Sequence, residues 1–251
     1  MALGASFVLV AVPAVILVGL AKGGFAGVGT LATPLMALVV SPVEAAAILL
    51  PILIIQDVVS VWVFRHDWDK ALLAVTLPGA VVGILLGYAF AAHVSPALVG
   101  LAIGVISVVF GLRQFALRPA TSMPGTRSVW RGVLSGIAAG FTSQVAHAGA
   151  PPFQMYVIPL RLSRNAFIGT SAIFFATVNW MKVPAYIALG QFSATSLRIS
   201  VLLIPLAIAS TWLGVWLVRR VPTEKFYRII YALIIMVGIR LIYGGVVYWR
   251  G

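Results

Sequence analysis

Two stretches of the chain place polar side chains and flexible backbone inside long apolar runs. The first, residues 22–34, reads KGGFAGVGTLATP and lies within the apolar run 3–40. Glycines allow a sharp turn and a close approach of the backbone to a ligand, and a helix that resumes after such a break offers N–H groups to an anion. The lysine adds a full positive charge. This pattern predicts an anion site that includes Lys22, Gly23, Gly24, Gly27, Gly29 and Thr30.

The second stretch, residues 138–152, reads AAGFTSQVAHAGAPP and lies within the apolar run 129–162. It departs from a purely glycine pattern and supplies side chains that donate hydrogen bonds, followed by two prolines. In hydrocarbon, non-helical backbone survives only where it lines a cavity or is buried in protein. We therefore expect a second part of the same anion site, formed by Thr142, Ser143, Gln144 and His147.

Single polar residues inside other apolar segments extend the predicted site. Asp57 stands eight residues before Arg65, which places it about 12 Å from a segment end at the helical rise of 1.5 Å per residue. Gln56 is adjacent, and Asn179 occupies the corresponding place in the second half of the chain. Polar residues at this depth are rare and usually functional, so we add Gln56 and Asn179 to the predicted anion site.

Two ionisable residues are candidates for coupling transport to protons. Asp57 is the only carboxylate placed well inside a segment, and His147 lies in the second break. Histidine titrates near neutral pH, and a carboxylate at membrane depth commonly belongs to a proton relay. The alternative for Asp57 is a purely structural ion pair with Lys22 or Lys182, and for Lys22 it is a position at the headgroups.

The composition identifies the elements that hold these residues as membrane-spanning helices. Of 251 residues, 62% are hydrophobic and 9% charged, and the mean hydropathy is +1.11, whereas a soluble domain carries roughly 25% charged residues. The net charge of +12 resides mostly at segment ends, which fits anionic lipid headgroups and not nucleic acid. No basic residue precedes the first apolar run, so we interpret that run as a span and not as a secretory signal. The fold class predicted is an all-α polytopic membrane protein.

Segment lengths predict six single crossings and two longer structures. A crossing needs about 20 residues, but the runs 3–40 and 129–162 are too long for one helix. Residues 129–140 would give only about 18 Å of helix before the glycine, which reaches mid-membrane. We therefore expect re-entrant hairpins whose tips meet near the midplane from opposite faces, with two full crossings possible for the first run. The single crossings are expected at 43–65, 69–91, 95–117, 165–189, 194–218 and 222–248.

Charge placement supports runs that return to their starting face. With this topology one face of the membrane receives twelve basic residues and the other face only three, Arg198, Arg240 and Arg250, while Lys22 and Lys182 stay inside. Such an imbalance is typical of the cytoplasmic side, which places both termini outside. The basic face then receives twelve residues: Arg65, Lys70, Arg113, Arg118, Arg127, Arg131, Arg161, Arg164, Arg219, Arg220, Lys225 and Arg228.

The chain is organised as two similar halves, 1–117 and 129–251, joined by a cytoplasmic connector at 118–128. GGFAGVGTLATPLM is similar to AGFTSQVAHAGAPPFQM, and Ser41 corresponds to Ser163. Under the charge-based topology the halves start on opposite faces, so they are inverted repeats. This is the usual plan of a secondary transporter, whose site lies where the repeats meet.

Other function classes fit the sequence less well. A cation or metal permease needs clustered carboxylates, histidines or thiolates, and this chain has no cysteine and scattered histidines. A membrane-embedded enzyme could use Asp57 and His147 as a base and its orienting group, although no motif places a nucleophile beside them. A passive anion channel remains open. The glycines could also serve helix packing alone, and Arg198 and Arg240 could be headgroup anchors.

The sequence resembles the TauE/SafE family of sulfite exporters, which are small bacterial permeases for sulfur-containing anions. The resemblance rests on Gly23, Gly24, Gly27, Gly29 and Pro34, on SPVEAAAILLP at 41–51, and on the second-half copy. It implies transport of sulfite, organosulfonates or related oxyanions, often as export, by a protein of the bacterial inner membrane. No cofactor is expected. Membrane lipid is the expected surrounding, nucleic acid is not a partner, and a homodimer is possible.

Overall fold

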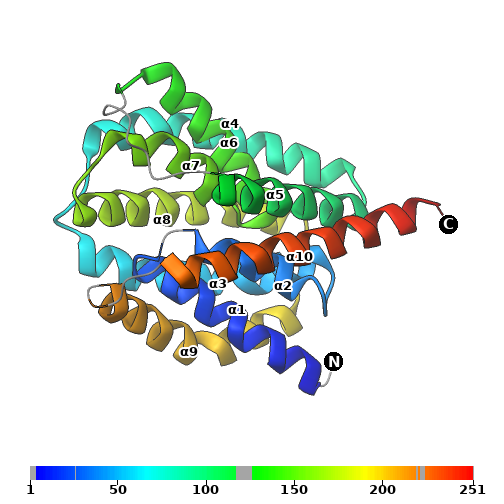
Figure 1. The fold of residues 1–251 in the computed structure, drawn as a ribbon. Coiled ribbons are helices and arrows are strands. Elements are labelled where there is room, and N and C mark those ends of the chain that lie inside the picture. Colours follow the sequence, from blue (N-terminus) through cyan, green and yellow to red (C-terminus); the bar gives the residue numbers. More distant parts are fainter. Residues whose placement is uncertain (1–3, 26, 117–125, 219, 221–223, 251) are drawn as a thin grey trace.

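The computed structural model describes residues 4–25, 27–116, 126–218, 220 and 224–250, and these are arranged as a bundle of helices (Figure 1). No strand occurs in these ranges. The first half contains α1 Ala5–Gly23, the 3-10 helix η1 Val28–Leu31, α2 Ala32–Met36, α3 Pro42–Phe64, α4 Lys70–His93 and α5 Pro96–Ala116. The second half contains α6 Val129–Ala146, α7 Ala150–Val157, the 3-10 helix η2 Ile158–Leu160, α8 Arg164–Ala188, α9 Ala194–Val218 and α10 Glu224–Arg250.

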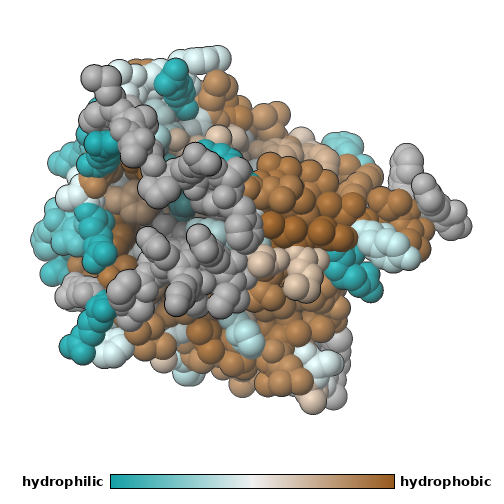
Figure 2. Space-filling view, viewed as in Figure 1, coloured by the Kyte–Doolittle hydropathy of each residue, from teal (hydrophilic) through white to brown (hydrophobic). Residues whose placement is uncertain are grey.

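The long helices identify the chain as a multi-pass membrane protein. Among the described residues α1, α3, α4, α8 and α9 are long and apolar enough to cross a bilayer, and α5 and α10 contain shorter apolar stretches. All six helices expected as single crossings are present, with ends that agree to within two residues, and four of them, α3, α4, α8 and α9, have the length and apolar character of a crossing. Large apolar side chains such as Leu85 and Leu202 point outward, and Figure 2 shows a broad hydrophobic surface away from one hydrophilic end.

The first long run breaks where the glycines predicted. Helix α1 has 19 residues, or about 28 Å of helix, and ends at Gly23. Gly24 and Gly27 then adopt positive φ angles of 130° and 88°, a conformation that side chains with a Cβ disfavour. The chain returns through η1 and the short helix α2 to the start of α3. The break predicted in the first long run, 3–40, is therefore present.

The prediction that the sixth helix stops at Gly140 is wrong. Helix α6 continues through Gly140 to Ala146, giving 18 residues and about 27 Å of helix. Gly140 instead permits close packing, because a Cβ at this position would lie 2.2 Å from the carbonyl oxygen of Ala80 in α4. The chain turns later, at His147, whose φ of 52° is left-handed.

The two tips therefore pass each other and do not meet at the midplane. The tip of α1 reaches Asp57, which lies about 12 Å from the end of α3 near Arg65. The tip of α6 reaches Ala46, only four residues, or about 6 Å, from the other end of α3. Measured along α3, each tip therefore lies within about two helical turns of one end of that helix, and the two tips lie near opposite ends.

Several basic segment ends lie together at one end of the bundle. The Arg127 guanidinium donates to Asp69 Oδ2 at 2.6 Å, and the Asp69 N–H donates to Thr170 Oγ1 at 2.9 Å. Arg164 donates to the carbonyl oxygen of Val218 at 3.1 Å. We call this the basic end. The N- and C-termini lie toward the opposite end (Figure 1), which fits the predicted topology, while the assignment of the basic end to the cytoplasm stays a prediction.

The Arg127–Asp69 pair gives a pH-dependent contribution to stability. Partial burial acts to raise the pKa of Asp69, but hydrogen bonds from Arg127 and from the Leu72 N–H outweigh it, so this pKa lies below its usual value. A carboxyl group with a lowered pKa in the folded state stabilises the fold above its unfolded pKa of about 3.9, and this stabilisation is lost as the pH falls below that value. Asp69→Asn keeps the N-cap oxygen that accepts from Leu72. We expect it to lower the thermal midpoint at pH 7 and to match the wild type only when the pH has fallen below the lowered pKa of Asp69. A difference that persists at low pH would contradict this account.

Helix contacts exchange between the halves as an inverted repeat would require. Helix α4 of the first half packs along α6 of the second half, and the equivalent pair, α9 of the second half and α1 of the first, also pack together. Helix α3 packs against its counterpart α8, and α5 against its counterpart α10. The corresponding residues Ser41 and Ser163 both cap a helix, accepting from Glu44 N at 3.1 Å and from Ala166 N at 3.3 Å. These contacts support the inverted repeat, which stays a prediction.

Candidate anion site

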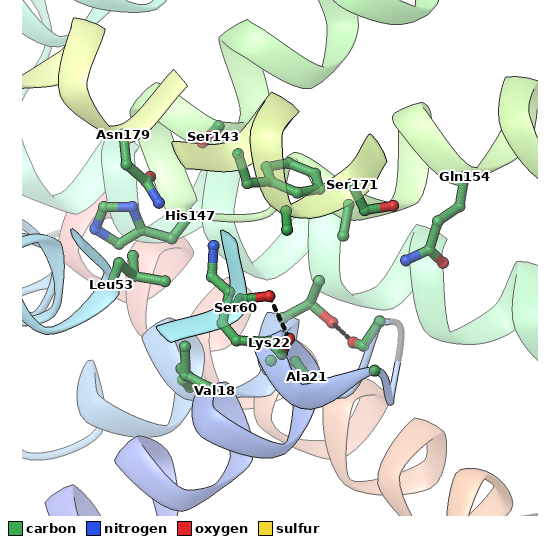
Figure 3. Close-up of a pocket in the computed structure, with 18 of the residues that line it drawn as sticks. Val18, Ala21, Lys22, Leu53, Ser60, Ser143, His147, Gln154, Ser171 and Asn179 are labelled. Atoms are coloured by element: carbon green, nitrogen blue, oxygen red, sulfur yellow. Dashed lines mark hydrogen bonds between the residues drawn. The ribbon is translucent and has the colours of Figure 1, made fainter. Parts of the chain in front are cut away.

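A cavity of about 90 Å³ lies between the two halves, next to both breaks. From the first half it is lined by Lys22, by Ser60 and by the glycine segment after α1. From the second half it is lined by Ser143, His147 and Asn179, among others. Figure 3 shows Lys22 extending from α1 toward Asn179 and His147. The volume has room for a few water molecules or a small ion.

Lys22, Asp57 and Asn179 form a buried chain of hydrogen bonds across three helices. The Lys22 ammonium donates to Asp57 Oδ1 as an ion pair, and Asn179 Nδ2 donates to Asp57 Oδ2 at 2.6 Å. The Asp57 side chain is 1% exposed and the Lys22 side chain 12% exposed. The lysine therefore forms part of the cavity wall and the carboxylate lies behind it. Ser60 Oγ donates to the Lys22 carbonyl oxygen at 2.8 Å, which holds α1 against α3 at this point.

Lys182 is a second, fully buried lysine beside the cavity. Its Nζ lies 3.2 Å from Ser143 O, 3.1 Å from Ser143 Oγ and 2.7 Å from His147 Nδ1. An ammonium group has three hydrogens to donate, and these three acceptors match them. No ion pair between described residues includes Lys182. Its hydrogen-bond partners are therefore all neutral groups.

His147 connects Lys182 to the backbone of α3. Its Nε2 lies 2.9 Å from the Ala46 carbonyl oxygen, which can only accept, so Nε2 carries the hydrogen. The neutral ring then accepts from Lys182 at Nδ1. Both ring nitrogens are occupied, and no hydrogen bond joins His147 to Asp57. The base-and-orienter pair that a membrane-embedded enzyme would need is absent from these contacts.

With both buried lysines protonated, the charges around the cavity leave one positive charge in excess. Lys22 and Lys182 provide two cations, whereas Asp57 is the one carboxylate that hydrogen-bonds either of them among the described residues. Coulombic attraction is far stronger in a low-dielectric interior than in water. A cavity with this balance favours a small anion.

The structure brings most, but not all, of the predicted site residues to the cavity. Asp57 contacts two lining residues from behind, as described above. The residues that line it are Lys22, Gly24, Gly27, Gly29, Thr30, Ser143, His147 and Asn179.

The other four predicted residues have different surroundings. Gly23 packs on α9, where an added Cβ would lie 2.4 Å from the carbonyl carbon of Gly214. Thr142 Oγ1 donates within its own helix, to Ala138 O at 2.7 Å. Gln56 donates to two backbone carbonyls, at 3.3 and 3.4 Å. Gln144 is buried, and its amide has no hydrogen-bond partner within the described part of the chain.

The expected contribution of helix N-termini is small. Helix α2 has only five residues, too few to provide a substantial dipole. Helix α7 begins with Pro151 and Pro152 in its first positions, and proline has no backbone N–H to donate. The groups at the cavity that could attract an anion are therefore the two lysines and not the helices that resume after the breaks.

Some cavity-associated residues were missing from the predicted site. Lys182 was expected inside the membrane but was not assigned to the anion site, and Ser60 was not considered. In the two halves Asp57 corresponds to Asn179, 122 residues later, and Ser60 corresponds to Lys182 at the same spacing. The repeat could therefore have identified Ser60 and Lys182 as further site residues. Ser171 and Gln154 also line the cavity, without an evident signal in the sequence.

Apolar helices of membrane-spanning length in two halves, with a cavity between them that is lined in part by lysine, serine, histidine and asparagine side chains, indicate an integral membrane transporter. The chain matches the family described as sulfite exporter TauE/SafE over residues 11–241, nearly its whole length. It therefore belongs to the TauE/SafE sulfite exporter family. No curated protein and no solved structure matches it.

Proposed function

We propose that this protein carries a small sulfur oxyanion, such as sulfite or an organosulfonate, across the bacterial inner membrane, in the direction of export. The observation that carries the proposal is the surplus positive charge at a cavity between the halves. Membership of a family described as sulfite exporters supports the substrate class.

In this proposal the anion binds at the Lys22 ammonium. Lys22 is the only lysine that lines the cavity in the described part of the chain, and its Nζ also lies 5.3 Å from the centre of the Phe175 ring. The buried Lys182 adds an attractive field from behind Ser143 and His147. Alternating access would follow from movement of the repeats around this fixed site, as in other inverted-repeat transporters.

Asp57 supplies a mechanism for proton coupling. When its carboxylate is charged, it occupies Lys22 as a counter-ion. Protonation of Asp57 would release Lys22, so that the anion replaces the carboxylate as the partner of the ammonium. Binding of one anion would then take up one proton. The Lys182–His147 pair is the second place where a proton can be held, because one hydrogen lies between two nitrogen atoms 2.7 Å apart.

Transport by purified protein in liposomes tests this function. We expect uptake of sulfite or sulfoacetate and little movement of acetate or of potassium. For the wild type, half-saturation should occur at lower anion concentration as the pH falls, because protons release Lys22 from Asp57. Asp57→Asn should reduce this pH dependence, since asparagine cannot bind the proton. Transport of none of the sulfur anions by correctly folded protein would refute the function, and an unchanged pH dependence in Asp57→Asn would refute the coupling alone.

A further inference from the structure

A second, larger cavity lies near the end of the bundle opposite the basic end. Its volume is about 600 Å³, and its wall combines the turn after α2 with the first residues of α3 and α5 and with α10. Small residues such as Ala97, Gly100 and Gly245 leave the space open. Under the predicted topology this end faces the outside of the cell.

Arg240 is the one charged residue among those that line this cavity. Its guanidinium extends past Gly244, where an added Cβ would lie 3.6 Å from Nη1. No ion pair between described residues includes Arg240. A guanidinium presents a rigid fork of donors that matches two oxygens of a sulfonate, sulfite or phosphate group. The charge of Arg240 therefore faces the cavity without a compensating carboxylate among the described residues.

The two cavities lie at the two ends of one short helix. Ala32 and Thr33, at the start of α2, line the central cavity, while Ala37 and Leu38, just after α2, line the outer one. The returning limb of the first break thus separates a lysine-lined space from an arginine-lined space. An anion that leaves the central cavity along α2 would arrive beside Arg240.

We propose that the outer cavity is a second oxyanion site, an exit vestibule in which Arg240 binds the sulfur oxyanion after it passes α2. This inference rests on the proposed function and adds a defined step to the route. A phosphodiester of an anionic lipid has the same recognition chemistry, so the experiment must separate these two sources. The position beside α2 favours the transported anion.

Equilibrium binding of radiolabelled sulfite to purified protein in neutral detergent tests the vestibule. We expect two bound anions per chain for the wild type and one for Arg240→Gln. Arg198→Gln is the matched control, because Arg198 is an exposed arginine of α9 at the same end of the bundle but does not line the cavity. This control should retain both anions. Adding phosphatidylglycerol should leave the sulfite stoichiometry unchanged.

Each other outcome identifies which part of the account fails. Two bound anions in Arg240→Gln would overturn the vestibule. A wild type that binds only one anion would also overturn it, if that anion is lost in Lys182→Met and retained in Arg240→Gln. Loss of the second anion on adding phosphatidylglycerol, with tight lipid binding that requires Arg240, would assign the cavity to a lipid and also overturn it. No sulfite binding by folded wild-type protein would refute the proposed function and this inference together.

Discussion

Lys22→Met is expected to abolish anion transport and to destabilise the fold strongly. The substitution removes the lysine from the cavity wall and leaves Asp57, which is 1% exposed, without its counter-ion. Only Asn179 would still donate to the carboxylate. Removing one partner of a buried ion pair typically costs about 3–5 kcal/mol of folding free energy. The thermal midpoint in detergent and uptake of sulfite into liposomes measure the two effects separately.

The double variant Lys22→Met, Asp57→Asn separates stability from function. It removes both charges together and leaves an asparagine that can pair with Asn179, so most of the lost stability should return. Transport should not return, because the cavity still lacks its lysine. Full transport by the double variant would show that the Lys22–Asp57 pair serves only the fold. Failure to regain stability would contradict the ion-pair explanation of the single variant.

Lys182→Met is expected to lose anion transport while keeping or gaining stability. Lys182 is fully buried against neutral acceptors, and burying an ammonium without a carboxylate is costly. Methionine has a similar length and avoids that cost, although His147 Nδ1 would lose its donor. A stable but inactive variant is the signature of a residue kept for function at the expense of stability.

Lys70→Met is the matched control for this second prediction. Lys70 is an exposed lysine at the start of α4, at the basic end, and is not among the residues that line the cavity. The control should transport like the wild type and unfold at a similar temperature. A marked loss of stability in Lys182→Met with transport intact would make Lys182 a structural residue and would remove the surplus charge from the mechanism.

The sequence was sufficient to predict features that depend on local composition. Single crossings such as α3 and α8 follow from continuous apolar runs, and Ser41 and Ser163, which correspond in the two halves, cap these two helices. The break at Gly24 and Gly27 follows from the clustering of glycines. Lys22 and Lys182 were expected in the interior, and both side chains are largely or fully buried.

The features that failed depend on which helices pack together. Gly140 looks like a break in the sequence, but the carbonyl of Ala80 in α4 requires a glycine there, and nothing near residue 140 reveals that contact. Lys182 joins the site because α6 places Ser143 and His147 against α8. Gln56 leaves it because α3 turns this amide toward α1 and α9. Sequence spacing along one helix does not determine such partners.

Thermal unfolding in the presence of increasing sulfite tests the central claim most directly, with wild type, Lys182→Met and Lys70→Met compared. A ligand that binds only the folded protein raises its stability by RT ln(1 + [L]/Kd). We predict stabilisation that rises with sulfite concentration in the wild type and in Lys70→Met, and its loss in Lys182→Met. Equal stabilisation of all three proteins, or none of the wild type, would contradict an anion site created by the surplus positive charge.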